Sequence, residues 1–373
     1  MIVGVPKEIK QAELRVGLTP ASVNELVVHG HEVVVETNAG VGIGASDDAY
    51  LEAGAKVLSS AEAVFDRAGM IVKVKEPQKP ERALLRADHV LFTYLHLAPD
   101  PDQTADLVDS GATCIAYETV TAQDGSLPLL APMSQVAGRM SIQAGAHALE
   151  AARGGAGLLI GGVPGVAPAK VVVIGGGVVG ENAIEMAIGL GGDVTVLDRN
   201  VRVLEHLEQR FGSSIRTVYS NTATLREYVL DADLVVGAVL VPGAKAPRLV
   251  TAEMVSEMRT GSVLVDVAID QGGCFETSHP TTHAEPTYIV DGVVHYCVAN
   301  MPGAVPKTST YALNNATLPF VLALADKGAV AALRDDPHLL NGLNVTGGRV
   351  TEPHVAESLD YPYLAPEEAI SAP

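Results

Sequence analysis

The segment VVVIGGGVVG, residues 171–180, decides the fold of this chain of 373 residues. An apolar, β-branched run leads into Gly175, Gly177 and Gly180, and the helix-like stretch VVGENAIEMAIGL follows. At this G-x-G-x-x-G spacing, the first glycine permits a tight turn, the second lets the backbone approach a pyrophosphate, and the third permits close packing of helix on strand. Amide groups at the start of the helix and its dipole then hold the phosphates. The segment therefore predicts a dinucleotide-binding loop.

The next predicted strand supports this interpretation. It is DVTVLD (193–198) and ends in Asp198, about 20 residues after the loop, where the acidic residue of such a unit binds the ribose diol. A carboxylate there repels a 2′-phosphate, so the sequence favours NAD over NADP. Arg199 and Arg202 follow closely, and the pattern leaves open whether either one contacts the cofactor.

The loop lies in the second of two series in which apolar runs alternate with helix-like stretches. The first series has runs at 2–5, 32–37, 70–75, 89–95 and 112–117, and the second has runs at 170–175, 193–198, 214–220, 233–240, 262–270 and 293–300. Strands joined by helices form βαβ units with parallel strands. The sequence predicts an α/β fold of two doubly wound, Rossmann-like parallel sheets with an interdomain cleft.

The order of the segments also predicts the domain boundaries. An Ala- and Gly-rich helix at 134–152 bridges the domains, and the tail from Val305 begins with another long helix, followed by segments too short to form a core of their own. A chain of this length exceeds what one hydrophobic core usually serves. We expect residues 1–130 plus 307–373 to form a discontinuous substrate and catalytic domain, and residues 131–306 to form the NAD-binding domain.

The composition excludes several classes of protein. Hydrophobic residues make up 47% and charged residues 18%, which is typical of a well-packed globular chain. The net charge of −19 disfavours nucleic acid and anionic membranes as partners. Three cysteines offer no paired framework, and the sequence has neither a signal core nor an apolar run long enough to span a bilayer. We therefore expect a reducing, cytoplasmic location.

Ligands of open α/β sheets bind outside the carboxyl ends of the strands. Candidate site residues follow the predicted strands here at Arg15, Lys75, His96, Ser220, Val239, Leu240, Asp270 and Asn300. Both sheets would direct these ends into the cleft between the domains. A single histidine after an apolar run, such as His96 after VLFTYL, is more often a core residue that donates to a backbone carbonyl, so only the collective pattern favours a functional role.

These side chains suit hydride transfer to or from a small 2-oxo or 2-amino acid. A guanidinium can hold a carboxylate through two hydrogen bonds, and an ammonium can polarise a carbonyl oxygen. An imidazole exchanges protons near neutral pH, and a nicotinamide performs the redox step. The sequence therefore predicts an NAD-dependent oxidoreductase.

A second group of potential ligands raises the alternative of a metal site. It consists of Cys274, His279, His283, His295 and Cys297. Pro280 and Pro286 break any helix that would place His279 and His283 on one face, and the spacing matches no zinc pattern. We therefore expect a loop with scattered histidines and no bound metal.

Extended segments along the chain carry a family resemblance. They are VGVPKEIK and RVGLTP near the start, KVKEP (73–77), LFTYLHLA (91–98), AYETV (116–120), PLLAPMSQVAGR (128–139), GGVPGV (161–166), LVPGAKAP (240–247), DVAIDQGGCFE (266–276) and YCVANMPGAVPKTSTYAL (296–313). Over essentially its whole length, the chain resembles the bacterial alanine dehydrogenases, a family shared with the nucleotide-binding subunit of proton-translocating transhydrogenase.

The resemblance implies a role for each site residue. Arg15 and Lys75 would bind the carboxylate and the carbonyl of pyruvate. His96 would be the catalytic acid and base, with Asp270 beside it in the closed cleft. The cofactor contacts would come from Ser134, Gly175, Gly177, Val178, Gly180, Asp198, Ser220, Val239, Leu240, Val267, Asp270, Val298, Asn300 and Met301.

The implied reaction is the reversible conversion of L-alanine, NAD⁺ and water to pyruvate, NADH and ammonium, a step of amino acid catabolism. Hydride leaves Cα for the nicotinamide, water adds to the iminium with His96 as base, and the carbinolamine collapses as His96 returns the proton to nitrogen. Lys75 nearby would favour the neutral imidazole. The family is typically hexameric. Strictness for alanine over glycine, serine or glyoxylate stays open, because a methyl-sized pocket discriminates by only ~1–3 kcal/mol.

Two alternatives also stay open. A soluble nucleotide-binding subunit of a proton-translocating transhydrogenase would share the fold and the glycine loop, although Arg15, Lys75 and His96 suit an amino acid better than a hydride relay between two nucleotides. A non-catalytic NAD-binding regulator would keep the glycine loop and lose part of the proton-transfer set, which is complete here.

Overall fold

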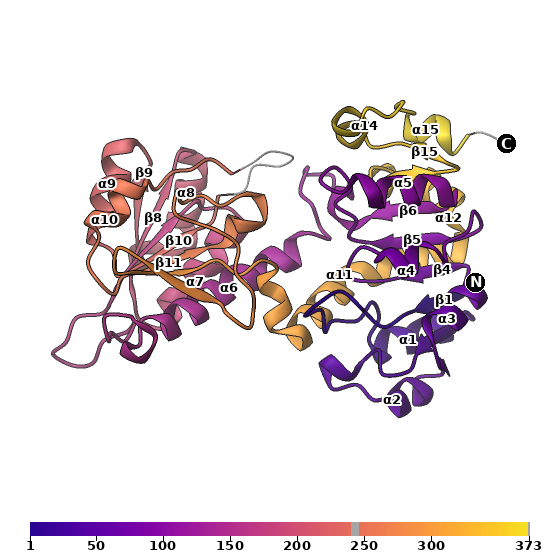
Figure 1. Ribbon diagram of the computed structural model, residues 1–373, viewed down its shortest axis with the longest axis horizontal. Helices are drawn as coiled ribbons and strands as arrows, with labels where there is room; N and C mark the ends of the chain where they lie inside the picture. The colour runs from indigo at the N-terminus through magenta and orange to yellow at the C-terminus, as the bar shows by residue number, and fades with distance from the viewer. Residues whose placement is uncertain (240–245, 372–373) are drawn as a thin grey trace. The chain divides into compact units, whose positions relative to one another are not determined.

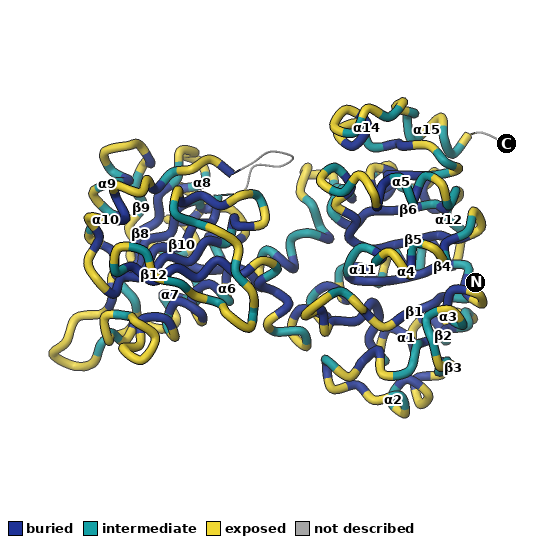
Figure 2. Tube along the Cα trace, viewed as in Figure 1, coloured by how far each residue is buried: buried dark blue, intermediate teal, exposed yellow. Residues whose placement is uncertain are grey.

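The chain forms two compact units, which a computed structural model describes for residues 1–239 and 246–371 (Figure 1). Unit 1 comprises Met1–Met133 and Val305–Pro373, and unit 2 comprises Ser134–Ala304. Most of the strands in both units are buried (Figure 2). Within the described ranges, no helix is both long enough and apolar enough to cross a membrane.

Unit 1 is built on one sheet. Its strands are β1 (Ile2–Val5), β2 (Glu32–Glu36), β3 (Lys56–Leu58), β4 (Met70–Val72), β5 (Val90–Thr93), β6 (Thr113–Ala116), β14 (Leu343–Thr346) and β15 (Arg349–Val350). Among the described residues their order is β15-β14-β6-β5-β4-β1-β2-β3. Strands β1 to β6 are parallel, and β14 and β15 extend the sheet as antiparallel strands. The strand order therefore reverses between β1 and β4.

Helices cover both faces of this sheet. They are α1 (Pro20–Val28), α2 (Asp47–Glu52), α3 (Ala61–Arg67), α4 (Lys79–Arg82), α5 (Pro101–Ser110), α11 (Pro306–Lys327), α12 (Ala329–Asp335), α13 (Pro337–Leu340), α14 (Pro353–Leu359) and α15 (Pro366–Ala369), with the 3₁₀ turns η1 (Val41–Ile43) and η2 (Tyr117–Thr119). Residues of α3, α5 and α14 pack in one core cluster with strand residues such as Val34, Ile71 and Leu91. Helix α11 contacts α1. Together with α12, it lies on the opposite face of the sheet from α5 (Figure 1).

Local sequence explains where these helices begin and end. Thr19 caps α1 by accepting a hydrogen bond from the Ser22 N–H, Pro20 occupies the first turn, and Gly30 follows the helix with a φ of 83°. Threonine, proline and glycine are residue types that favour these three positions of a helix. The long helix predicted after Val305 is α11. It belongs to unit 1, together with the rest of the described tail.

Unit 2 contains the glycine loop. Its strands are β7 (Lys170–Ile174), β8 (Asp193–Asp198), β9 (Ile215–Tyr219), β10 (Leu234–Gly237), β11 (Val263–Asp266), β12 (Thr287–Val290) and β13 (Val293–Tyr296). Among the described residues their order is β12-β13-β11-β10-β7-β8-β9, with β12 antiparallel to β13 and the other pairs parallel. If β7 to β11 are numbered 1 to 5, these five strands lie side by side in the order 3-2-1-4-5, which is the order of a doubly wound sheet. The predicted fold class is confirmed.

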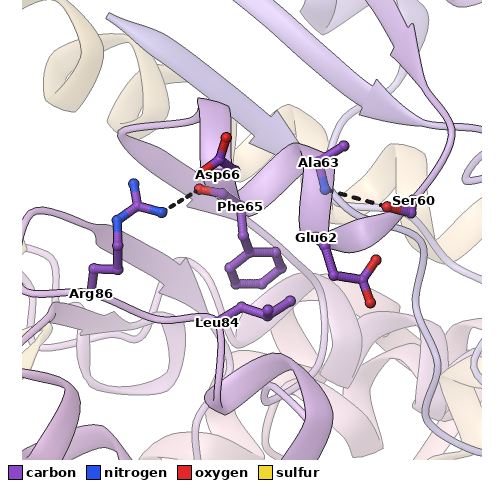
Figure 3. A pocket seen from close by; sticks show the side chains of 7 residues that line it. All are labelled: Ser60, Glu62, Ala63, Phe65, Asp66, Leu84 and Arg86. Carbon is purple, nitrogen blue, oxygen red and sulfur yellow. Dashed lines mark hydrogen bonds between the residues drawn. The ribbon is translucent and has the colours of Figure 1, made fainter.

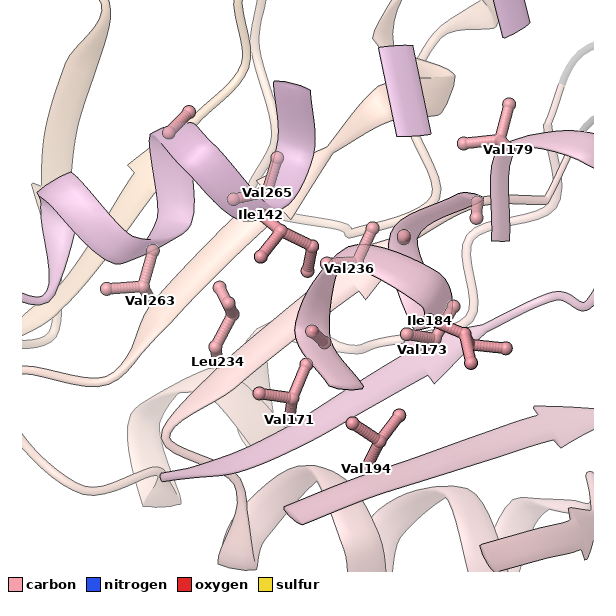
Figure 4. Packing of buried hydrophobic residues seen from close by; sticks show 14 of the residues in the cluster. Ile142, Val171, Val173, Val179, Ile184, Val194, Leu234, Val236, Val263 and Val265 are labelled. Atoms are coloured by element: carbon pink, nitrogen blue, oxygen red, sulfur yellow. The ribbon is translucent and has the colours of Figure 1, made fainter. Parts of the chain in front are cut away.

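Helices also cover both faces of the unit 2 sheet. They are α6 (Ala131–Ala148), α7 (Val178–Gly189), α8 (Val201–Phe211), α9 (Thr222–Asp231) and α10 (Ala252–Glu257), with the 3₁₀ turns η3 (Ala151–Arg153), η4 (Gly212–Ser214), η5 (Val267–Gln271) and η6 (Met301–Ala304). Val171 and Val173 of β7 pack with residues of α6 and α7 such as Ile142 and Ile184 (Figure 4). The alternate residues of β7 pack with α9 and α10 in a second cluster. This alternation is what a strand buried on both faces requires.

The structure contains two hairpins that the sequence analysis does not predict. Asp291 and Gly292 join β12 to β13, with φ angles of 49° and 80°, and Gly347 and Gly348 join β14 to β15, with φ angles of 55° and 75°. Two successive residues with positive φ form the type I′ turn that matches the twist of a hairpin. The segments after α11 therefore do more than pack on unit 1, because they add strands to its sheet. The short strand β3 was also not predicted.

Several predicted strands are shorter than expected, and β4 and β11 are two of them. Strand β4 ends at Val72 and not at residue 75, although the Lys73 N–H still donates to the Phe92 carbonyl at 3.2 Å. Strand β11 ends at Asp266 and not at residue 270, because the chain turns into η5. Lys75 and Asp270 therefore lie in the connections that follow the strands.

A buried ion cluster lies just beyond β4. The Lys73 ammonium is 0% exposed and lies 3.0 Å from Glu8 Oε2 and 2.6 Å from Glu81 Oε1. Burial acts to lower the pKa of Lys73, but the two carboxylates outweigh it and raise this pKa. Glu8 Oε1 also accepts a hydrogen bond from the Val74 N–H at 2.7 Å. The cluster thereby ties the chain after β1 to the chain after β4.

We expect Lys73→Met to destabilise the protein by about 3–5 kcal/mol at neutral pH, because two buried carboxylates lose their common cation. Burial already raises the pKa of Glu8 in the folded state. A folded state that binds more protons than the unfolded state gains stability as pH falls, so part of the loss should be recovered toward about pH 5. Urea unfolding at neutral and acidic pH measures both effects.

The matched control is Lys56→Met, which removes an exposed ammonium 2.8 Å from Glu32 Oε2. An exposed ion pair contributes at most about 1 kcal/mol, so this substitution should have little effect at either pH. Similar unfolding free energies for the two variants would show that the buried cluster is not required.

Candidate active site

The predicted substrate residues follow three neighbouring parallel strands of unit 1. Arg15 lies in the connection after β1, Lys75 lies after β4, and His96 lies after β5. Parallel strands of one sheet bring their carboxyl ends to the same edge, so these side chains start from one edge.

His96 is exposed, in contrast to the interpretation as a core histidine. Its side chain is 47% exposed, and its φ of 51° is unusual for a residue other than glycine. The backbone N–H groups of Leu95 and His96 donate to the Glu118 carboxylate at 3.2 and 2.5 Å. Nδ1 of the ring lies 3.6 Å from the same carboxylate. Glu118 therefore holds both the turn and the imidazole that the turn presents.

Tyr94 stacks on His96 and lies within electrostatic reach of Arg15. The Tyr94 ring stacks on the imidazole with a centroid distance of 5.8 Å and an interplanar angle of 3°. Its hydroxyl donates to the Leu129 carbonyl at 2.5 Å. Burial raises the pKa of Tyr94 above its ordinary value, while the charges of Arg15 and Glu118 act on it in opposite directions. Both charges are therefore within electrostatic reach of one tyrosine.

Arg15 is buried against a carboxylate. Its side chain is 2% exposed, with Nε 2.7 Å from Glu13 Oε1 and Nη2 2.5 Å from Glu13 Oε2. Nη1 donates to the Met133 sulfur at 3.1 Å. Burial acts to raise the pKa of Glu13, but the hydrogen bonds and charge of Arg15, with a contribution from Lys75, lower it. Arg15 and Glu13 therefore form a charged pair, and Lys75 lies near it.

Helix α11 supports the connection that carries Arg15. Asn314 accepts a hydrogen bond from the Thr19 N–H at 2.9 Å and donates to the Gly17 carbonyl at 3.1 Å. A Cβ atom at Gly17 would lie 2.3 Å from the Val72 carbonyl oxygen, so glycine is needed where this connection crosses the end of β4. Helix α11, which follows unit 2 in the sequence, thus helps to fix the connection that carries Arg15.

The sequence analysis did not single out Glu13, Tyr94 or Glu118. The signal that finds His96 could also have found Glu118, since it directly follows the apolar run ATCIAY. Glu13 and Tyr94 give no such signal, because their importance depends on partners that only the fold brings together.

The glycine loop of unit 2 has the backbone that the sequence predicts. Gly175 has a φ of 99°, and a Cβ atom at Gly180 would lie 1.9 Å from the Gly175 carbonyl oxygen. A Cβ atom at Gly177 would meet nothing within 4 Å, so this position faces open space. Helix α7 begins at Val178, and the first amides of a helix have no acceptor within the helix. The loop therefore fits a pyrophosphate against its open side.

Asp198 is fixed beside this loop. Its carboxylate accepts hydrogen bonds from the N–H of Gly176 at 2.8 Å and from the N–H of Asn200 at 2.7 Å. Its carbonyl accepts a hydrogen bond from the Ser220 N–H at 2.9 Å. The half-buried carboxylate has a fixed orientation at the end of β8, as binding of a ribose diol requires. Arg199 and Arg202 are exposed, and their contact with a cofactor stays a prediction.

Asp270 and Asn300 lie together in unit 2. Asp270 is exposed in η5, and the Asn300 N–H lies 3.3 Å from its Oδ1 and 3.4 Å from its Oδ2. Asn300 has a φ of 58°. The predicted position of Asp270 beside His96 stays a prediction, because His96 belongs to unit 1.

The remaining predicted cofactor contacts differ in exposure. Ser134, Val239 and Val267 are half-buried. The side chains of Val298 and Met301 belong to the hydrophobic core, at 0% and 2% exposure, so these two residues can offer a ligand mainly their backbone. Leu240 lies outside the described residues.

Most of the histidines and cysteines of residues 274–297 make protein contacts, whereas Nε2 of His283 is buried without a hydrogen-bond partner among the described residues. His279 stacks on Tyr288 with a centroid distance of 3.7 Å, and Nε2 of His295 lies 2.7 Å from the Thr277 hydroxyl. Cys274 and Cys297 are buried. In the part of the chain that the structure describes, no group of three or more His, Cys, Asp or Glu side chains is arranged to hold a metal ion.

A surface hollow of about 520 Å³ lies elsewhere on unit 1 (Figure 3). It is lined by Ser60, Glu62, Ala63, Phe65, Asp66, Leu84 and Arg86. Arg86 points across it to the Phe65 carbonyl at 3.1 Å. None of the predicted site residues lines this hollow, so the candidate site does not include it.

Family models match both halves of the chain. Residues 4–137 match "Alanine dehydrogenase/PNT, N-terminal domain", and residues 141–353 match "Alanine dehydrogenase/PNT, C-terminal domain". The chain is also 62% identical over 364 residues to an alanine dehydrogenase of Halomonas elongata, with 98% of each chain covered.

Solved structures share the fold over nearly the whole chain. An L-alanine dehydrogenase has a TM-score of 0.94 and 56% identity, covering 96% of this chain and 99% of that chain. A transhydrogenase from Sinorhizobium meliloti has a TM-score of 0.80 and 26% identity, covering 95% of this chain and 99% of that chain. On these matches, the chain belongs to the alanine dehydrogenase/PNT family.

Proposed function

We propose that this protein is an NAD-dependent L-alanine dehydrogenase, an oxidoreductase that reversibly deaminates L-alanine to pyruvate and ammonium. The observation that carries the proposal is the exposed imidazole of His96, held by Glu118 in the same unit as the cations of Arg15 and Lys75. The name of a relative at 62% identity supports the same reaction.

In this proposal, unit 1 is the substrate and catalytic domain. Arg15 binds the substrate carboxylate, and Lys75 polarises the carbonyl oxygen of pyruvate. Glu13 supports Arg15 by fixing its orientation, because the carboxylate bonds both Nε and Nη2.

His96 moves the protons. Its ring takes a proton from the water that attacks the iminium carbon, and it returns a proton to the nitrogen that leaves. Glu118 stabilises the protonated ring when it forms, since its carboxylate lies 3.6 Å from Nδ1. The stacked ring of Tyr94 limits rotation of the imidazole.

Unit 2 is the NAD-binding domain in this proposal. When bound, NAD supplies the acceptor for the hydride of the alanine Cα. The amides at the start of α7 hold the pyrophosphate, and Asp198 binds the ribose diol. The proposed contacts are Ser134, Gly175, Gly177, Val178, Gly180, Asp198, Ser220, Val239, Leu240, Val267, Asp270, Val298, Asn300 and Met301.

The family resemblance also supports three further proposals, on location, partners and assembly. We propose that the protein acts in the cytoplasm, that its partners are the small molecules L-alanine, pyruvate and ammonium, and that it assembles as a homo-hexamer. The net charge of −19 favours small molecules over nucleic acid. A transhydrogenase subunit shares the fold at only 26% identity, which makes it the weaker candidate.

We expect the purified protein to form NADH from NAD⁺ when L-alanine is added, and to oxidise NADH when pyruvate and ammonium are added. A spectrophotometric assay with a panel of amino acids, run with NAD and NADP in parallel, measures this activity. If no amino acid gives a change in NADH or NADPH absorbance, the protein has the fold of the family but not the reaction, and the proposal is wrong.

We expect His96→Gln to reduce turnover by at least about a hundredfold, because glutamine cannot exchange a proton near neutral pH. Binding of NADH, followed by its fluorescence, should stay close to that of the unchanged protein, since the proposed NAD site belongs to unit 2. His147→Gln is the control, because His147 is also an exposed histidine beside a carboxylate, 3.3 Å from Glu150. Near-normal turnover of the His96 variant would exclude His96 as the acid and base.

We expect Asp198→Ala to weaken NADH binding by about tenfold, or ~1.4 kcal/mol, and to reduce the preference over NADPH. The variant loses the carboxylate that would bind the ribose diol and repel a 2′-phosphate. Asp193→Ala is the control, because Asp193 begins the strand that Asp198 ends and its side chain is 45% exposed. Fluorescence titrations with both dinucleotides measure the effect. Equal affinities of the two variants for NADH would contradict the role of Asp198.

A further inference from the structure

A buried carboxylate lies at the end of β11, directly before the turn that carries Asp270. Asp266 is 0% exposed. Its Oδ1 accepts a hydrogen bond from the Ala268 N–H at 3.1 Å, and its Oδ2 accepts one from the Cys274 N–H at 2.9 Å. The Phe275 N–H lies 3.3 Å and the Ser278 hydroxyl 2.6 Å from Oδ2. One carboxylate thus holds both ends of residues 267–278.

We propose that Asp266 is a positioning residue, which fixes Asp270 and the Asn300 backbone for the reaction. The inference rests on the proposed function, because it assigns Asp266 to the alanine dehydrogenase site. Asp266 touches neither substrate nor cofactor in this proposal. It acts through the loop that it closes, which we call the 266–278 loop.

The shape of the 266–278 loop depends on this carboxylate. Gly272 and Gly273 have φ angles of 94° and 79°, and a Cβ atom at Gly273 would lie 2.7 Å from Asp266 Oδ2. On its other side, the loop packs tightly on β10, because a Cβ atom at Gly237 would lie 2.2 Å from the Cys274 sulfur. The loop therefore has little freedom to shift while Asp266 keeps its hydrogen bonds.

The same carboxylate reaches the next strand through side chains. Ser278, which donates to Asp266, accepts a hydrogen bond from the Cys297 thiol at 3.6 Å. The Tyr288 hydroxyl lies 3.5 Å from the Cys297 sulfur. Cys297 follows β13, and three residues later the Asn300 N–H meets the Asp270 carboxylate. Asp266 is thus linked to both segments that form the Asp270–Asn300 contact.

The chemistry of the donors explains why a carboxylate is needed here. Two carboxylate oxygens accept from three backbone amides, one hydroxyl and the Cys274 thiol, whose sulfur lies 3.5 Å from Oδ1. An amide side chain can accept with only one of its two polar atoms. An asparagine would direct an NH₂ group at donors of the loop, whatever its orientation. Loss of these hydrogen bonds would leave buried N–H groups of the loop without acceptors. The loop would have to move for these groups to find other partners.

The test compares Asp266→Asn and Ser278→Ala with the unchanged protein. Alanine turnover, KM for alanine, the NADH dissociation constant and thermal stability are measured for each. We expect Asp266→Asn to lower kcat by tenfold or more and to raise the NADH dissociation constant by about threefold or more, because Asp270 and Asn300 are also proposed NAD contacts. Ser278→Ala removes one donor only, so we expect a fall in kcat of about threefold to tenfold in a stable protein.

Asp233→Asn is the matched control. Asp233 is also buried and accepts a hydrogen bond from the Lys170 N–H at 2.8 Å, but it lies at the start of β10, at the opposite edge of the same sheet. It should lower the thermal stability and leave kcat within twofold. If Asp266→Asn and Ser278→Ala also leave kcat within twofold, or if Asp233→Asn lowers kcat as much as they do, the positioning role is wrong.

Two further measurements separate this inference from the proposed function. If the unchanged protein is inactive with alanine, the proposed function fails, and hydrogen exchange decides whether the loop depends on Asp266. We expect faster exchange in residues 267–278 of Ser278→Ala and unchanged exchange there in Asp233→Asn. In an active protein, kcat of the double variant Asp266→Asn with Asp270→Asn should stay within twofold of Asp270→Asn alone, since coupled residues are not additive. A further tenfold loss would show that Asp266 does not act through Asp270.

Discussion

The parallel arrangement of the strands is the constraint on which the rest of the structure depends. In a parallel sheet every strand begins at one edge and ends at the other, so each connection after a strand starts from a common edge. In unit 1 this rule brings Arg15, Lys75 and His96 to one edge, although they are separated by long stretches of sequence. In unit 2 it brings the glycine loop after β7 and the turn after β11 to one edge in the same way.

Because of this arrangement, the N–H groups just beyond the strand ends need acceptors, and carboxylates supply them. The residues after the end of a strand no longer form hydrogen bonds with the neighbouring strand, so their N–H groups need other acceptors. Glu8 accepts from the Val74 N–H, Glu118 from the N–H groups of Leu95 and His96, and Asp266 from three amides of its own loop. A carboxylate can accept several N–H groups at once, so a single side chain fixes a whole turn. Acidic residues therefore fix the turns at the carboxyl ends of these strands. The exposed side chains of the same turns are left to contact a substrate or cofactor.

The sequence could predict features that depend on neighbouring residues. The strands β7 and β8 and the glycine turn follow from short-range pattern, and the structure has them in the expected places. The two glycine-containing hairpins could also have been found, because Asp-Gly and Gly-Gly are strong turn signals. The partners of the site residues could not. Glu13 pairs with Arg15 inside a buried environment, and Tyr94 stacks on His96 only because the chain turns at positive φ. These contacts depend on burial and on backbone geometry that no local pattern specifies.

The discontinuity of unit 1 follows from the same reasoning about long-range partners. The connection after β1 passes the end of β4 so closely that Gly17 has no room for a side chain. Its N–H and carbonyl groups need partners that the sheet edge cannot supply, and Asn314 and Thr310 of α11 supply them. Asn314 is 295 positions away from Thr19 in the sequence. The turn that carries Arg15 therefore depends on a helix that lies beyond unit 2 in the sequence, so the first third of the chain does not fix the geometry of this candidate site by itself.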